Sequence, residues 1–386
     1  MFAIPQSARR TSAPRPRKRV VTDRGGLVMS QTIRASSAPP APDAGRDEER
    51  SGSVLTSAAV ATVIAIAARA PSVHNTQPWK FRVVDDVIEL HADPDRLLAQ
   101  IDPVGRELVI SCGAALFGLR LGLRRFSCVP ALQLWPDPAQ PWLVARAWPS
   151  GRAPSNAVEA ELVAAVPHRH THRGPFTPGE VSPRLLATLA VDAAAEGAEL
   201  TFVEPPGLVS DLAALVDQAA ADQDAIAEIS NETRRWLRPD GSQARDGVPA
   251  RAATARDQQQ ARRFRRRNFG EPGDPTDRTG AEPAACDSAG EPPAATAVLV
   301  TDADTADDWL RAGQALNRLL LRAATRWVFA SLQSQPLESP RYRDRVRDLL
   351  GLPGQPQMLL QFGRANTALA TPRRLQAEYR TNGNRA

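Results

Sequence analysis

The sequence predicts an α+β fold made of two similarly organised halves. The chain has 386 residues, of which 42% are hydrophobic, so it can bury a sizeable core in two units or one large one. Helix-like and strand-like apolar patterns run through residues 51–156 and then again through residues 157–375. Pro-rich joints separate these elements, and no short repeat is visible.

In the first half, Thr56 or Ser57 can cap a helix, and Pro71 stops the chain from continuing it. Two alternating segments flank Asp85-Asp86, which is typical of a hairpin. The expected elements are a helix at 57–68, strands at 79–84 and 87–91, a long buried helix at 105–125, and strands near 132 and at 142–147.

The second half repeats this alternation but contains a long interruption. Residues 231–296 are rich in Arg, Pro, Gly, Asp and Gln and are too long for an ordinary connection, so we interpret them as a lid insertion. We expect residues 376–386 to be a flexible C-terminus. The expected elements are helices at 157–166, 183–195, 208–229, 306–325 and 341–350, and strands at 200–203, 297–301 and 358–362.

The net charge of +5 comes from the first 50 residues, which hold ten basic and five acidic side chains. The remaining residues hold 38 of each sign, so the body of the protein is neutral and bulk charge gives no reason to expect a nucleic-acid partner. Residues 1–50 lack an apolar pattern and are predicted to be a disordered tail. Met29 is an alternative start.

Cysteine content and hydropathy point to a cytoplasmic protein. Cys112, Cys128 and Cys286 are odd in number and lack C-x-x-C spacing, which fits a reducing compartment. No apolar run follows Arg9-Arg10 as in an export signal. The apolar stretch 58–68 is far shorter than the ~20 residues that span a membrane, so we expect no membrane partner.

The first candidate site is the segment Pro71–Phe81, which has the sequence PSVHNTQPWKF. It places short donors and acceptors on a loop before a strand, an arrangement that suits a planar heterocycle with donors and acceptors along its edge. The alternative is a polar turn that only caps the preceding helix.

The second candidate site is the segment His168–Arg173, which has the sequence HRHTHR. Arginines combined with a hydroxyl group ahead of a helix suit a phosphate. A metal site is the alternative, although the chain offers few further ligands because His74 and His91 are the other histidines.

One arginine pair and one arginine-rich run could also have functions. Arg373-Arg374 lies near the C-terminus, where solvated arginines are common. The run Arg262–Arg267, interleaved with Phe264 and followed by Phe269, could contact nucleic acid, although a solvated loop explains the same residues without a binding fold.

The segments 71–79 (PSVHNTQPW) and 169–173 (RHTHR), together with the C-terminal segment 356–360 (PQMLL), resemble the FMN-binding nitroreductase superfamily. More narrowly, they are similar to the Acg family of actinobacterial nitroreductase-like proteins. The resemblance covers about residues 55–375. It implies a nitroreductase-like fold in which residues 51–156 and 157–375 form two nitroreductase-like halves, an internal pseudo-dimer that binds one FMN. The protein would then be a monomer or a homodimer.

The resemblance also implies which residues bind the cofactor. Arg169 would face the FMN phosphate and Arg173 the pyrimidine edge of the flavin, with Thr171 in place of the family's Ser. The segment at residues 336–338 matches a string whose backbone amide meets flavin N5, with Ser339 where the family has Gly. The full set of implied cofactor-binding residues is Pro71, Ser72, Asn75, Gln77, Arg169, His170, Thr171, Arg173, Pro336, Leu337, Glu338, Arg373 and Arg374.

The implied function is that of an FMN-dependent oxidoreductase. In such enzymes a hydride passes from NADPH or NADH to the flavin and then to a small-molecule acceptor such as a nitro compound or a quinone, so the cofactor supplies the chemistry and no catalytic side chain is expected. The alternative is a lidded protein that binds or sequesters FMN with little turnover.

Overall fold

The structure is a computed structural model that describes residues 55–174, 176–250, 264, 267, 269, 294–365 and 371–382. All of these residues belong to one compact unit, Arg46–Ala386. The predicted tail at 1–50 lies outside the described residues, and so does the larger part of the predicted insertion.

The predicted α+β class is confirmed, and the first half of the chain forms one sheet with its helices. The strands pair in the order β1-β2-β4-β3, each antiparallel to its neighbour. The elements are α1 (Ser57–Ala67), η1 (Val73–Asn75), β1 (Trp79–Val84), β2 (Val87–Ala92), η2 (Pro94–Arg96), α2 (Arg106–Arg125), β3 (Cys128–Leu134) and β4 (Leu143–Arg152).

The second half forms another sheet, in the order β5-β8-β10-β9, again with antiparallel neighbours. A short parallel pair, β6 with β7, stands apart from both sheets. The elements are α3 (Ala157–Ala165), α4 (Pro183–Ala194), β5 (Glu199–Phe202), α5 (Pro206–Asp224), α6 (Ala227–Arg235), β6 (Leu237–Arg238), β7 (Val248–Pro249), β8 (Ala295–Thr301), α8 (Ala306–Ala324), β9 (Val328–Leu332), α9 (Gln335–Glu338), α10 (Pro340–Leu350), β10 (Gln355–Arg364), α11 (Gln376–Tyr379) and β11 (Arg380–Asn382).

The two halves follow the same path. In each main sheet, β11 aside, two strands precede a long helix and two follow it, α2 taking this place in the first half and α8 in the second. The spatial strand order is also the same, since β1-β2-β4-β3 corresponds to β5-β8-β10-β9. The two sheets therefore share one strand order.

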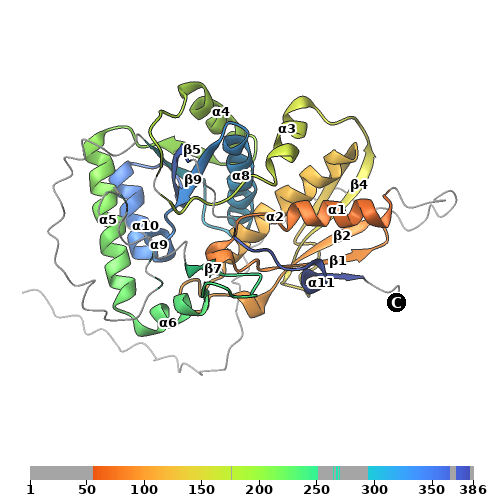
Figure 1. The fold of residues 1–386 in the computed structure, drawn as a ribbon, viewed down its shortest axis with the longest axis horizontal. Helices are drawn as coiled ribbons and strands as arrows, with labels where there is room; N and C mark the ends of the chain where they lie inside the picture. The colour runs from red at the N-terminus through yellow and green to blue at the C-terminus, as the bar shows by residue number, and fades with distance from the viewer. Residues whose placement is uncertain are drawn as a thin grey trace, which may run out of the picture. The chain divides into compact units, whose positions relative to one another are not determined.

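Helices α2 and α8 pack against each other in the middle of the unit (Figure 1). The two backbones meet at Gly113 and Gly313. A Cβ atom added to Gly113 would lie 2.3 Å from the Leu310 carbonyl oxygen, and one added to Gly313 would lie 2.0 Å from the Ile110 carbonyl oxygen. Glycine is therefore required on both helices at this crossing.

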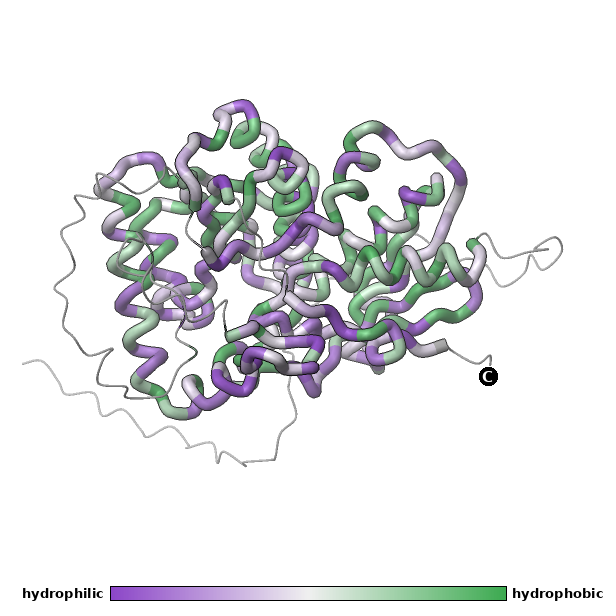
Figure 2. Tube along the Cα trace, viewed as in Figure 1, coloured by the Kyte–Doolittle hydropathy of each residue, from purple (hydrophilic) through white to green (hydrophobic). Residues whose placement is uncertain are grey.

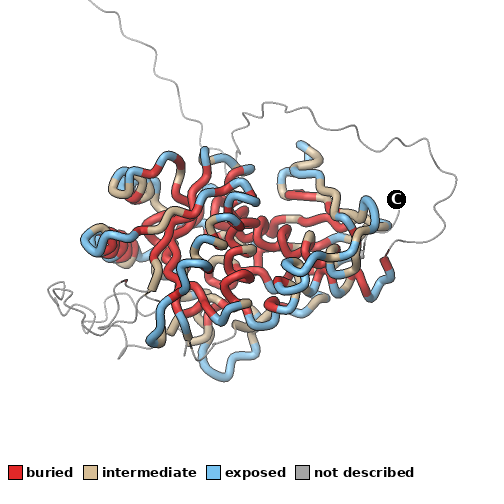
Figure 3. Tube along the Cα trace, turned by 90° about the horizontal axis from the view of Figure 1, so that it is seen from above, coloured by how far each residue is buried: buried red, intermediate tan, exposed pale blue. Residues whose placement is uncertain are grey.

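Local sequence explains where the main helices begin and which face they bury. The Oγ1 of Thr56 accepts a hydrogen bond from the Ala59 amide at 3.2 Å, so Thr56 is the N-cap of α1. Thr305 and Asp308 form a capping box at the start of α8. Both apolar and polar residues occur along α5 (Figure 2), and its buried residues recur every three or four positions, as in an amphipathic helix. Buried residues concentrate in the central helices and the strands (Figure 3).

The end of the chain differs from the prediction of a flexible C-terminus. Residues 376–382 form α11 and β11, and β11 pairs in parallel with β1 at the edge of the first sheet. Tyr379 is buried, and its ring meets that of Phe81 edge-on at 5.9 Å. A single buried aromatic residue inside a polar segment leaves no periodic pattern to detect. Residues 383–386 lie outside the described residues.

The first part of the predicted insertion, residues 231–250, is packed onto the first half. The Glu232 carboxylate accepts hydrogen bonds from the backbone amides of Gln100 and Ile101, at 3.0 and 2.9 Å. The Gly247 amide donates to the Asn75 carbonyl oxygen at 3.2 Å. These partners are more than a hundred residues away, so composition alone could not reveal them.

Candidate functional site

The loop between α1 and β1 is held by side chains that bind distant backbone groups. Asn75 donates from Nδ2 to the carbonyl oxygens of Gly247 and Pro372, each at 3.0 Å. Its Oδ1 accepts from a guanidinium nitrogen of Arg373 at 2.7 Å. Asn75 therefore joins this loop to both the 245–247 segment and the C-terminal segment.

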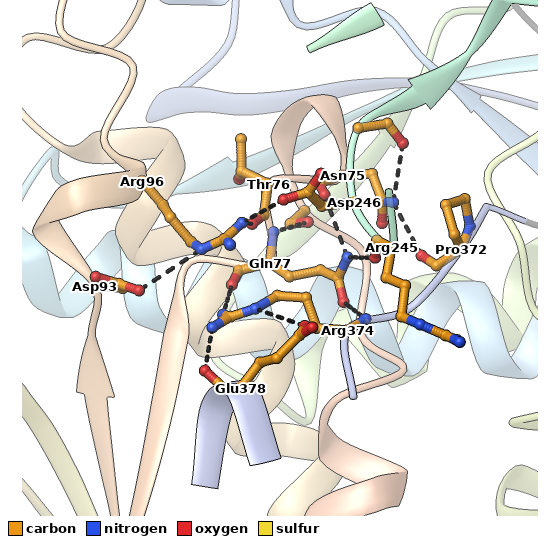
Figure 4. Close-up of polar contacts among 12 residues, drawn as sticks. Asn75, Thr76, Gln77, Asp93, Arg96, Arg245, Asp246, Pro372, Arg374 and Glu378 are labelled. Atoms are coloured by element: carbon orange, nitrogen blue, oxygen red, sulfur yellow. Dashed lines mark hydrogen bonds and ion pairs between the residues drawn. The ribbon is translucent and has the colours of Figure 1, made fainter. Parts of the chain in front are cut away.

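Gln77 makes a second set of such contacts (Figure 4). Its Nε2 donates to the Arg245 carbonyl oxygen at 2.9 Å, and its Oε1 accepts from the Arg374 amide at 2.9 Å. The Arg374 guanidinium donates to the backbone carbonyls of Gln77 and Trp79, at 3.0 and 3.3 Å, and to that of Glu378. Arg374 thus links the backbone at Gln77 and Trp79 to the backbone at Glu378.

Asn75, Gln77 and Arg374 are predicted to contact the cofactor, and in the structure their side chains bind protein groups. None of the three lines either of the two cavities described below. Asn75 and Gln77 bond to protein groups more than 160 residues away in the chain or to the loop itself, and Arg374 bonds to this loop and to the nearby Glu378. These contacts hold the loop in place.

A cavity forms where the 71–74 loop, the start of α2 and the 171–173 segment meet, and we call it the main cavity. Its lining comes from both halves of the chain, including three residues of the predicted insertion. The lining residues are Pro71, Ser72, Val73, His74, Glu107, Ile110, Ser111, Thr171, His172, Arg173, Val248, Arg267, Phe269, Leu316, Ser331, Leu332, Gln333, Ser334 and Met358.

The main cavity brings together four predicted site residues, Pro71, Ser72, Thr171 and Arg173. Ser72 also supports the loop, because its Oγ accepts a hydrogen bond from the Gln77 amide at 2.9 Å. Thr171 forms an isolated parallel bridge with Ala330 of β9, and this bridge fixes the 171–173 segment beside the second sheet.

Charged groups of both signs surround the main cavity. The Glu107 carboxylate is buried and paired with Arg106, whose guanidinium also binds Gln357. Burial raises the pKa of Glu107, Arg106 opposes this shift, and Glu338 adds to it. Burial lowers the pKa of Arg173 to about 10. The cavity therefore holds a buried carboxyl group with a raised pKa beside an arginine that favours a bound anion.

A second cavity lies next to the main one along the 168–173 segment, and we call it the basic cavity. Arg169 and His170 line it, while the next residue, Thr171, lines the main cavity. The His170 ring packs on Phe329 with centroids 4.1 Å apart. The complete lining is Arg69, Pro167, His168, Arg169, His170, Trp327, Phe329, Thr371 and Arg373.

The basic cavity gathers three guanidinium groups without a carboxylate among its lining residues. Burial lowers the pKa of Arg169 to about 9, and Arg69 and Arg173 contribute to the shift. Burial and then Arg169 also lower the pKa of Arg373. Within the described residues, Nη1 of Arg169 and Nε of Arg373 are buried without a hydrogen-bond partner. Since arginine remains charged, this cluster is suited to a bound anion such as a phosphate.

The predicted site residues Pro336, Leu337 and Glu338 lie on a short helix, α9, outside both cavities. The amides of Leu337 and Glu338 both donate to the Ser334 carbonyl oxygen, at 2.8 and 3.2 Å. The Glu338 carboxylate pairs with Arg267. These amides are therefore committed to the helical turn, and Ser334 rather than Glu338 reaches the main cavity.

Sequence reasoning missed several cavity residues. Arg69 precedes the candidate segment Pro71–Phe81, and Glu107 lies in the first turn of a buried helix, so neither belongs to a polar motif. Arg267 and Phe269 lie in a segment with no apolar period. His74 is inside the recognised loop, and its type could have marked it as a candidate.

The arginine run considered for nucleic-acid contact is described only in part. Phe264 is buried among residues of α5 and β8, and Phe269 lines the main cavity. Arg267 pairs with Glu338. These two rings are thus not exposed for stacking on bases, and residues 262, 263, 265 and 266 lie outside the described residues.

The described residues contain no group of three or more His, Cys, Asp or Glu side chains suited to hold a metal ion. Over the same part of the chain, no helix is long and apolar enough to cross a membrane.

Comparison with known proteins gives a relative that spans most of the chain. The Mycobacterium tuberculosis (strain H37Rv) protein named "Putative NAD(P)H nitroreductase Rv3131" is 34% identical over 322 residues, which cover 82% of this chain and 89% of that protein. "Putative NAD(P)H nitroreductase acg" of the same strain is 33% identical over 88 residues, or 23% of this chain and 27% of that protein. No family model matches the chain.

Among solved structures, a nitroreductase with bound FMN from Desulfitobacterium hafniense aligns with 58% of this chain and 98% of its own, at 14% identity and a TM-score of 0.37. A TM-score this low carries no weight for the fold. The relationship therefore rests on sequence similarity to the nitroreductase relative that covers 82% of this chain and 89% of its own.

Proposed function

The chain belongs to the nitroreductase family, and we propose that it is an FMN-dependent oxidoreductase that uses NADH or NADPH to reduce a nitro or quinone-like acceptor. The observation that carries this proposal is the pair of adjacent cavities along residues 169–173. One cavity is lined by arginines without a carboxylate, and the other is lined by apolar and polar side chains from both halves of the chain.

The two cavities match the two parts of FMN. The basic cavity would hold the phosphate, because Arg69, Arg169 and Arg373 converge there and two of them carry buried donor atoms without a partner among the described residues. The main cavity would hold the flavin ring, with Thr171 and Arg173 on one side and the 71–74 loop on another. A cofactor that spans both cavities explains why one five-residue segment lines them both.

When bound, FMN would supply the redox chemistry by taking electrons from the nicotinamide and passing them to the acceptor. The protein's own residues would position the ring, exclude water and hold a proton. Glu107 is the described carboxyl group that lines the main cavity, and burial raises its pKa. Arg173 would favour negative charge on a ligand bound there.

We also propose that the chain is an internal pseudo-dimer with one FMN. The equal strand orders of the two sheets and the packing of α2 against α8 support this. The 71–74 loop comes from the first half and the 171–173 segment from the second, and both line one main cavity. The ratio of flavin to chain, measured together with the native mass by light scattering, tests this: one FMN per chain is expected for a monomer or a homodimer.

Anaerobic reduction tests the proposed function. The protein is loaded with FMN, freed of excess cofactor, and mixed with NADPH or NADH without oxygen. Rapid loss of the flavin absorbance near 450 nm, followed by its return when a nitroaromatic or quinone is added, is the expected result. A flavin that stays oxidised with both nicotinamides would contradict the proposal.

A second candidate function is FMN binding with little turnover. The observation that favours it is the presence of Phe269 and Arg267, both from the predicted insertion, in the main cavity. Arg267 is held there by the Glu338 carboxylate and by Gln223 at 3.4 Å. If these side chains obstruct the substrate, Phe269→Ala will raise the rate of nicotinamide oxidation, whereas Phe176→Ala, outside the cavity, will not.

A further inference from the structure

His74 is a cavity residue with an unfavourable backbone conformation. Its φ of 45° and ψ of 20° lie in the left-handed region, which non-glycine residues rarely adopt. Asn75 and Gln77 also have positive φ, but their side chains bind backbone groups of distant segments. His74 has no such bonds, so the fold of the loop does not account for its side chain.

The imidazole of His74 is buried, with 7% of the residue exposed. Neither Nδ1 nor Nε2 has a hydrogen-bond partner within the described parts of the chain. Its ring contact is with Phe269, edge-on at a centroid distance of 5.2 Å. Buried polar atoms usually have partners, because leaving them unpaired costs free energy. An imidazole held this way at a cavity wall is therefore available to a ligand.

The electrostatic surroundings keep this imidazole neutral. Burial lowers the pKa of His74 well below its ordinary value, and Arg267 and Arg173 lower it further. A neutral imidazole has one N–H donor and one nitrogen acceptor. His74 can thus make hydrogen bonds to an uncharged ligand atom, while the arginines beside it provide the positive charge.

The other lining residues indicate the shape of that ligand. Ile110, Leu316 and Met358 give the cavity apolar surfaces, and the Phe269 ring lies beside His74. We propose that His74 hydrogen-bonds a carbonyl or nitro oxygen on the edge of a planar conjugated ring in the main cavity, and so selects ligands that carry this group. The inference rests on the proposed function. The oxygen can belong to the flavin or to the electron acceptor.

Two substitutions separate the hydrogen bond from the shape of the side chain. His74→Phe keeps a planar ring beside Phe269 but removes both nitrogens. His74→Asn keeps a donor and an acceptor and tolerates the left-handed backbone. His91→Phe is the matched control. His91 lies on β2 and outside both cavities, and its Nε2 is within hydrogen-bond distance of the Glu89 carboxylate, at 3.1 Å.

Two dissociation constants distinguish the sources of the oxygen: that of FMN for the chain, and that of 4-nitrobenzamide for the FMN-loaded chain without reductant. We expect His74→Phe to weaken one of them about fivefold or more. Weaker binding of FMN would identify the flavin as the source of the oxygen, and weaker binding of 4-nitrobenzamide would identify the acceptor. His74→Asn should stay within about twofold of the unmodified chain, as should the control. Both constants unchanged in His74→Phe would overturn the inference.

Nitrogen-15 NMR of the unmodified chain keeps the inference testable if a variant does not fold. The His74 ring signals should move when FMN or 4-nitrobenzamide is added, while the His91 signals stay in place. Signals of His74 that do not move with either compound overturn the inference. A chain that binds no FMN refutes the proposed function instead, and the response of His74 to 4-nitrobenzamide then decides the inference by itself.

Discussion

Replacing Gly313 with alanine tests whether the crossing of α2 and α8 sets the position of the main cavity. The new Cβ would lie 2.0 Å from the Ile110 carbonyl oxygen, more than 1 Å inside ordinary contact, and the nearby atoms are backbone atoms that cannot rotate away. Overpacking of this kind costs about 3 kcal/mol, and alanine's better helix propensity returns about 1 kcal/mol. The expected loss is therefore about 2 kcal/mol, or about 4 °C in Tm.

Thermal unfolding with FMN titration is the assay. Gly207→Ala is the control, because a Cβ at this position on α5 meets no atom within 4 Å, and it should leave Tm unchanged or raise it by about 2 °C. Gly313→Ala should also weaken FMN binding, since α2 carries Ile110 and α8 carries Leu316 into the main cavity. If Gly313→Ala is as stable as Gly207→Ala, the close crossing is refuted.

Three further predictions concern the loop, a buried carboxyl group and the basic cavity. Asn75→Ala removes bonds to two separate segments and should destabilise the protein by about 2 to 3 kcal/mol in urea unfolding; a change below about 1 kcal/mol would contradict this. Burial raises the pKa of Asp102 to about 7, so the native state holds a proton that the unfolded state releases near pH 4, and stability should fall by up to about 4 kcal/mol as pH rises from 4 to 7. Asp102→Asn keeps an acceptor for the Leu108 amide and should flatten this fall in Tm, so an equally steep profile would disprove it. Arg373→Ala should lower the affinity for inorganic phosphate about tenfold in calorimetry, and unchanged affinity would count against the basic cavity.

The elements of the fold were predictable where a local pattern specifies them. The cap at Thr56, the hairpin around Asp85 and the buried helix after Gly105 all appear where the apolar period and the turn residues predict them. Segments that depend on distant partners were not predictable. The Tyr379 side chain, for example, orders the chain end by packing on Phe81, which is almost 300 residues earlier.

The candidate site shows the same division. Arg169, Thr171 and Arg173 line the cavities because one extended segment carries them past both. Asn75 and Gln77 have the polar side chains expected of ligand contacts, but the partners of their amides are backbone groups that only the fold brings near. The sequence thus indicates which loop matters, and the fold decides which of its side chains remain available.

The affinity of the chain for FMN compared with that for riboflavin tests the central claim most directly, because the two differ by the phosphate alone. If the basic cavity binds the phosphate, FMN should bind at least about 100-fold more tightly than riboflavin. Arg169→Ala should remove most of that difference with little effect on riboflavin, whereas Arg184→Ala, exposed on α4, should preserve it. Equal affinities for FMN and riboflavin, or a ratio that Arg169→Ala leaves unchanged, would contradict the account.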